Sequence, residues 1–100
     1  MLKRYKAHPV YNNLVLEDSE APEGLAQTFC VAGSRVPIML VEAGLALGMT
    51  VEQLLEDERI AGADPWRLRK IAEVWAEQRA GEPVWPPFLV GARSLFPNAA

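Results

Sequence analysis

Apolar residues recur at helical spacing in the middle of the chain, and turn-forming residues separate these stretches. In the first stretch, Ile38, Val41 and Leu45 fall on one side of a helix, and Gly48 follows them. A proline in the first turn leaves no N–H unsatisfied, so Pro37 marks the start of this helix. Glycine readily adopts the left-handed conformation that ends a helix. The pattern therefore predicts a helix between Pro37 and Gly48.

Two further helices are predicted from their N-terminal caps. Thr50 followed by Gln53 fits a capping box, in which each side chain bonds the backbone N–H of the other residue. Asp64 followed by Pro65 is typical of a third helix start, and Gly81 is expected to end that helix. The third helix has an apolar stripe at positions i, i+3, i+4 and i+7, formed by Leu68, Ile71, Ala72 and Trp75.

Two short segments before the helices are rich in residues that favour strands. They are residues 10–16 (VYNNLVL) and 27–31 (QTFCV), and an acidic loop containing Pro22 separates them. An isolated hairpin is marginally stable in water, so it must pack on the helices or pair with another chain. The predicted fold class is α+β and mostly α, with an N-terminal β-hairpin before a three-helix, helix-turn-helix-like core.

The C-terminal segment combines prolines with large apolar side chains. Its prolines at positions 83, 86, 87 and 97 are incompatible with a helix interior, so we expect residues 82–100 to form an extended tail after a domain of residues 1–81. Disordered tails are normally poor in aromatic residues, so this one should be packed. It either folds back on the hairpin or binds a partner. The candidate partner-binding residues are Val84, Trp85, Phe88, Leu89 and Phe96.

Size and charge limit the classes of partner. One hundred residues make one domain, and half of them are hydrophobic, which leaves apolar surface for a homo-oligomer or a complex. Thirteen acidic residues against ten basic ones give a net charge of −3. Nucleic-acid binders are usually basic, so any DNA contact must rest on a local patch.

Residues for catalysis and metal binding are scarce. The chain has one histidine, His8, and one cysteine, Cys30, which exclude an internal disulfide and a zinc site of the usual composition. Glu56, Asp57 and Glu58 could serve as acid–base groups, but a solvated helix end explains them more simply. We expect no enzyme activity, no cofactor and no metal. No apolar run has transmembrane length, and the basic N-terminal residues are not followed by an apolar signal-peptide region, so we expect a cytoplasmic protein without a membrane contact.

Four basic residues are candidates for DNA contact: Arg35, Arg67, Arg69 and Lys70. Arg67 and Lys70 share an outward face near the start of the third helix, where a recognition helix touches bases and phosphates. Arg35 lies in a glycine turn, where it could bind phosphate or a carboxylate that pins the turn. The alternative for the helix is a solvated, salt-bridged face, because Glu73 and Glu77 lie on it too. The loop of residues 58–63 is also longer than the turn of the standard motif.

The order of these elements resembles a known family. Residues 31–37 (VAGSRVP) and 48–55 (GMTVEQLL) are similar to the pattern of the domain of unknown function four-three-three family. The resemblance covers residues 27–78. Ser34 stands where the family has threonine, and Gln27-Thr28-Phe29 replaces its Gly-Lys-Pro.

Members of that family are small helix-turn-helix proteins, and many are regarded as VapB-type antitoxins paired with a PIN-like ribonuclease toxin. The resemblance implies that Gly33, Ser34, Arg35 and Pro37 form a structural signature, and it brings no catalytic residue. The leading hypothesis is an antitoxin-like protein that dimerises, binds a toxin and contacts its own operator DNA. The alternative is a protein-interaction or oligomerisation module with no nucleic-acid role.

Overall fold

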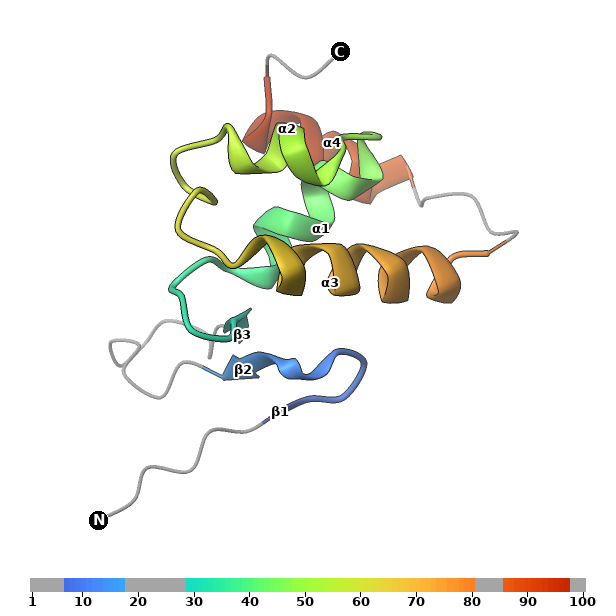
Figure 1. Ribbon diagram of the computed structural model, residues 1–100. Helices are drawn as coiled ribbons and strands as arrows, with labels where there is room; N and C mark the ends of the chain where they lie inside the picture. Colours follow the sequence, from blue (N-terminus) through green and yellow to red (C-terminus); the bar gives the residue numbers. More distant parts are fainter. Residues whose placement is uncertain (1–6, 18–28, 81–85, 98–100) are drawn as a thin grey trace, which may run out of the picture.

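A small antiparallel sheet precedes four helices in the computed structural model, which describes residues 7–17, 29–80 and 86–97, with only the backbone for 86–89 (Figure 1). The predicted α+β class is confirmed. The strands are β1 (Ala7–His8), β2 (Asn12–Glu17) and β3 (Phe29–Val31). The helices are α1 (Ile38–Ala46), α2 (Val51–Leu55), α3 (Pro65–Gln78) and α4 (Pro86–Leu95).

The sheet contains the predicted strand pair and one strand more. β2 and β3 are antiparallel, with Val15 opposite Val31, and β1 pairs with the other edge of β2. The prediction of a two-stranded hairpin was therefore incomplete. β1 has only two residues, too few to show the alternation of apolar and polar side chains that identifies a strand. At the outer edge of β3, Cys30 bridges to Pro37, which joins the sheet to the start of α1.

The predicted helix ends are confirmed where the structure describes them. Gly33 and Gly48 have φ angles of 81° and 83°, a region that side-chain-bearing residues rarely adopt. The Thr50–Gln53 capping box is formed at the start of α2, and the Asp64 side chain accepts the Trp66 N–H at the start of α3. α3 ends at Gln78, and Gly81 lies outside the described residues.

The core lies around α1, which packs on β3 and α4, while α3 contacts α2 and β2. Figure 1 shows the sheet at one end of the molecule and α2 and α4 at the other end. The largest fully buried side chains come from nearly every layer: Leu54, Ile60, Leu68, Ile71, Val15, Val31 and Val41. No helix in the described part of the chain is long and apolar enough to cross a membrane.

The prediction of an extended tail was wrong, because residues 86–95 form α4 and the core has a fourth helix. Pro86 and Pro87 are its first two residues, where the backbone N–H groups would have no partner within the helix. Prolines at these positions start a helix, whereas prolines in its interior break one. Ala92 and Phe96 are buried and α4 packs on α1, so this segment folds back on its own chain.

Candidate functional site

The turn that carries Arg35 lies beside the start of α3. The Ser34 hydroxyl fixes this turn by donating to the Val31 carbonyl at 2.8 Å and accepting from the Val36 N–H at 3.3 Å. A Cβ at Gly33 would lie 4.0 Å from Nη1 of Arg67. The structure therefore brings together two of the regions from which the candidate DNA-contact residues come. We call the Gly33 turn and the outward side of the first turns of α3 the α3 surface.

The three basic residues of α3 all have carboxylate neighbours. Nη1 of Arg67 lies 2.8 Å from Oδ2 of Asp64, and Nζ of Lys70 lies 3.5 Å from Oε2 of Glu73. Arg69 reaches across to α2, where its Nη2 is 3.9 Å from Oε1 of Glu52. The salt-bridged face that the sequence offered as an alternative is thus present. Exposed pairs of this kind contribute about 0–1 kcal/mol, so a phosphate can displace the carboxylate at little cost.

Trp66 belongs to the α3 surface and was missed by the sequence analysis. Its side chain is 56% exposed although it is among the largest apolar groups in the chain. The backbone N–H of Trp66 donates to Oδ1 of Asp64. The Lys70 ammonium lies 5.8 Å from the centre of the Trp66 indole ring. The sequence did contain a signal for an exposed Trp66, because this residue lies outside the apolar stripe that begins at Leu68. An exposed tryptophan next to arginine is the composition of a binding hot spot.

The predicted partner-binding residues are placed differently from the basic ones. Val84 and Trp85 lie outside the described residues, and Phe88 and Leu89 are in α4 with their side chains outside the description. Phe96 is 6% exposed and belongs to the core of its own chain. Most of the Phe96 ring therefore contacts its own chain.

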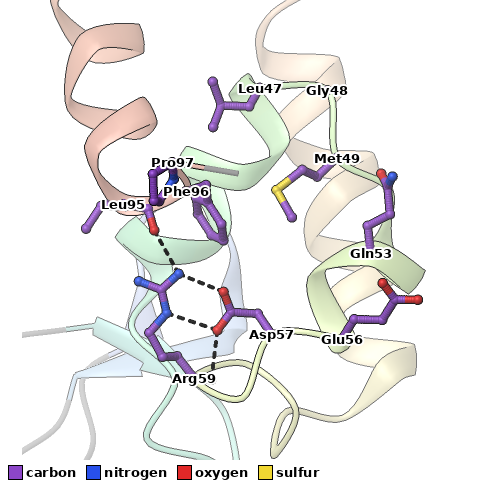
Figure 2. Close-up of a pocket in the computed structure, with 10 residues that line it drawn as sticks. All are labelled: Leu47, Gly48, Met49, Gln53, Glu56, Asp57, Arg59, Leu95, Phe96 and Pro97. Carbon is purple, nitrogen blue, oxygen red and sulfur yellow. Dashed lines mark hydrogen bonds and ion pairs between the residues drawn. The ribbon is translucent and has the colours of Figure 1, made fainter. Parts of the chain in front are cut away.

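A groove of about 630 Å³ lies between α2 and the end of α4 (Figure 2). We call it the α2–α4 groove. Apolar side chains from the α1–α2 turn form one wall and the residues that end α4 form the other. Its lining residues are Leu47, Gly48, Met49, Gln53, Glu56, Asp57, Arg59, Leu95, Phe96 and Pro97. Nothing in the sequence pattern indicated this groove, because its two walls come from segments about forty residues apart in the chain.

Arg59 joins the two walls of the groove. Its Nε and Nη2 atoms donate to both oxygens of Asp57 at 2.9 and 2.6 Å, and Nη2 also donates to the Leu95 carbonyl at 2.8 Å. The guanidinium carbon lies 4.9 Å from the centre of the Phe96 ring. The hydrogen bonds from Arg59 lower the pKa of the Asp57 carboxyl, which keeps it ionised at neutral pH. Through Arg59, Asp57 is thus a structural anchor for the end of α4.

A second, smaller pocket of about 230 Å³ lies between the β1–β2 turn, α1 and the end of α3. The buried Tyr11 hydroxyl donates to Oε2 of Glu42 at 2.8 Å. Burial, and next the Glu42 charge, raise the pKa of the Tyr11 phenol, so it stays protonated. The Trp75 indole N–H is buried and has no hydrogen-bond partner among the described residues, and the Arg79 guanidinium lies 5.2 Å from the centre of that ring. These contacts tie the strand turn to α1.

His8 closes the β1–β2 turn, and we expect it to make stability depend on pH. Its Nδ1 accepts the N–H groups of Val10 and Tyr11 at 3.0 and 3.3 Å, and its ring packs against Tyr11 and Phe29. Burial lowers the pKa of His8 below its ordinary 6.5, although the Glu42 charge acts in the opposite direction. The unfolded chain therefore binds the proton more readily. The contribution of neutral His8 to the free energy of unfolding should be fully present above about pH 6.5 and should fall as the pH drops below that value.

His8→Asn is the matched variant for this prediction, because an asparagine oxygen can accept the same backbone N–H groups without titrating. Urea unfolding of both proteins at pH 7.5 and pH 5.5, values chosen to bracket the ordinary histidine pKa of about 6.5, measures the effect. The native protein should lose more stability on acidification than His8→Asn. Identical losses would show that His8 is not the titrating group.

No group of three or more His, Cys, Asp or Glu side chains that could hold a metal ion occurs within residues 7–17, 29–80 and 86–97. No protein-family model, no curated protein and no solved structure matches the chain. The function must therefore be argued from the geometry of the α3 surface and the two pockets.

Proposed function

We propose that this chain is a non-enzymatic, helix-turn-helix-like protein of the antitoxin type that binds double-stranded DNA through the α3 surface. The observation that supports this most directly is the position of Arg67 next to the Gly33 turn. It places the turn that carries Arg35 beside the helix face that carries Arg67 and Lys70. In helix-turn-helix proteins this end of the recognition helix contacts bases and phosphates.

The exposure of the α3 surface supports a contact with a large ligand. Trp66 is 56% exposed at the second position of the helix, so the described chain does not cover it. The arginine and lysine side chains around it can exchange their carboxylate partners for phosphates. α2 has only five residues, and the chain between α2 and α3 is longer than the turn of the standard motif. We therefore assign the DNA contact to α3 and the Gly33 turn rather than to α2.

A net charge of −3 predicts weak, salt-dependent binding for one copy of the chain. A homodimer would double the number of phosphate contacts, and small helix-turn-helix proteins usually bind as dimers. The proposal therefore includes homodimerisation. It also includes a toxin partner of the ribonuclease type, which the resemblance to the antitoxin family implies.

Arg67→Glu is expected to weaken DNA binding about tenfold or more without unfolding the domain, because it replaces a phosphate contact by repulsion. Glutamate in the first turn of a helix is favourable to the helix dipole, which protects the fold. The measurement is fluorescence anisotropy with a labelled pool of mixed-sequence duplexes at about 50 and 200 mM salt. Circular dichroism checks that the helices are intact.

Arg93→Glu is the matched control. Arg93 is an exposed residue on α4, and its reversal changes the net charge by the same amount at a site outside the α3 surface. Its effect on affinity should be within about twofold. Equal losses for the two variants would mean that only the total charge matters, and the α3 surface would then have no special role.

The second candidate function is a protein-interaction module with no nucleic-acid role. One observation favours it: each base on α3 already lies within 3.9 Å of a carboxylate, so the surface is close to neutral. Under this function, Trp66 and Arg67 would be hot-spot residues for a protein. A native protein that fails to bind the duplex pool even at about 50 mM salt would favour this candidate over the first.

A further inference from the structure

We propose that the α2–α4 groove is the docking site for a protein partner, and that the partner presents a basic segment with aliphatic neighbours. The inference deepens the proposed function and rests on its partner-binding half, because it states the chemistry of the partner. The segment would place a lysine or arginine stem along the apolar walls and its charged head at Glu56.

The apolar part of the groove is open and comes from two sides. Leu47 and Met49 are half-buried on the α1–α2 turn, and Leu95 is 39% exposed at the end of α4. Figure 2 shows the Met49 side chain on the wall from the α1–α2 turn and the Phe96 ring on the wall from the end of α4. A Cβ at Gly48 would meet nothing within 4 Å, so the rim is open at this turn. The volume of about 630 Å³ is in the usual range for a binding site and accommodates several side chains.

The charge of the groove selects a cation. Glu56 lines it, is exposed, and has no side-chain hydrogen bond or ion pair with any described residue. Arg59 is the one base among the lining residues, and its guanidinium is held by both oxygens of Asp57 and by the Leu95 carbonyl. The groove therefore presents an unmatched negative charge beside apolar walls.

A lysine or arginine side chain fits this combination better than a purely apolar or an acidic one. Such side chains bury their methylene stems along apolar surface while the charged head stays at the polar rim. The head would reach Glu56, while aliphatic neighbours fill the space between Met49 and Leu95. A partner of this chemistry satisfies both the apolar walls and the unmatched carboxylate.

The test uses the isotope-labelled full chain and a defined probe, a short acetylated peptide of alternating Lys and Leu. Its titration should produce saturable shifts of the backbone amide signals of Gly48, Met49 and Gln53. A peptide of alternating Glu and Leu should produce none at these positions. Absence of saturable shifts with the basic peptide would overturn the proposal.

Two pairs of variants locate the contact. Glu56→Lys should weaken peptide binding about fivefold or more, whereas Glu58→Lys, an exposed neighbour that does not line the groove, should stay within about twofold. Met49→Ala should weaken binding and Met39→Ala, on the exposed side of α1, should not. Equal effects of Glu56→Lys and Glu58→Lys would show that the peptide responds only to the total charge of the protein, and this would overturn the proposed site.

The same experiment separates this inference from the DNA proposal and from self-association. Arg67→Glu should bind the peptide as the native protein does, so loss of DNA binding alone leaves the groove in place. Conversely, native DNA binding without any peptide shifts would remove only the groove. Shifts at Gly48 and Gln53 that depend on protein concentration without peptide would assign the groove to a second copy of the chain and overturn the basic partner.

Discussion

Phe96→Ala is expected to lower the free energy of unfolding by about 3–5 kcal/mol, as is usual when a buried aromatic ring is removed. The ring is 6% exposed, directly follows α4, and lies beneath the Arg59 guanidinium. It also packs close to Gly44 of α1, so its loss leaves a cavity between α1 and α4. Small domains have a total stability of about 5–15 kcal/mol, so the variant should unfold at a much lower urea concentration.

Leu95→Ala is the matched control for Phe96→Ala. Leu95 is the preceding residue and is 39% exposed, so its truncation should cost less than about 1 kcal/mol. Truncation after Gly81, which removes all of α4, should abolish cooperative unfolding altogether. Equal effects of the two alanine variants in urea unfolding, or a cooperative transition in the truncated chain, would contradict the assignment of this segment to the core.

The helix starts and stops were predictable because they depend on neighbours in the sequence. The Thr50–Gln53 capping box, the Asp64 cap and the positive φ of Gly48 each involve residues within a few positions of one another. Local hydrogen bonds and backbone sterics favour these features without the help of a distant segment. The two strands β2 and β3 were predictable from their content of β-forming residues, and their closeness in the sequence favours a hairpin.

α4 was not predictable from the same rules, because a proline has opposite meanings at the start and in the interior of a helix. Which meaning applies to Pro86 and Pro87 depends on whether the following residues pack as a helix. That packing is supplied by α1, about fifty residues earlier in the chain, which contacts α4 on the side of the buried Ala92 and Phe96. The extended-tail prediction lacked this long-range contact.

The candidate site also combines features that the sequence predicts with features that depend on distant contacts. The basic residues of α3 could be identified from the sequence, but their partners could not. Glu73 follows Arg69 by one helical turn, yet in the structure Arg69 lies near Glu52 of α2 and Glu73 lies near Lys70. The proximity of Gly33 to Arg67 and the α2–α4 groove depend on how distant segments pack, so only the structure provides them.

Gly44→Ala is expected to destabilise the protein by about 1–2 kcal/mol, although alanine is the better helix former by about 1 kcal/mol. A Cβ on Gly44 would overlap Cδ2 of Leu54, and would lie 3.3 Å from Sδ of Met49 and 3.4 Å from Cζ of Phe96. Leu54 is fully buried, so moving its side chain requires its close-packed core neighbours to shift as well. Overpacking should therefore exceed the gain in helix propensity.

Gly91→Ala is the control for Gly44→Ala, because the two variants are expected to change the stability of the protein in opposite directions. Gly91 lies in the interior of α4, is exposed, and a Cβ there would meet nothing within 4 Å. The same substitution should therefore stabilise the protein by about 0.5–1 kcal/mol through helix propensity alone. Urea unfolding of the two variants should move the midpoint in opposite directions. If Gly44→Ala also stabilised the protein, the close contact of α1 with Leu54 and Phe96 would be wrong, and the wall that Phe96 provides to the α2–α4 groove would be placed incorrectly.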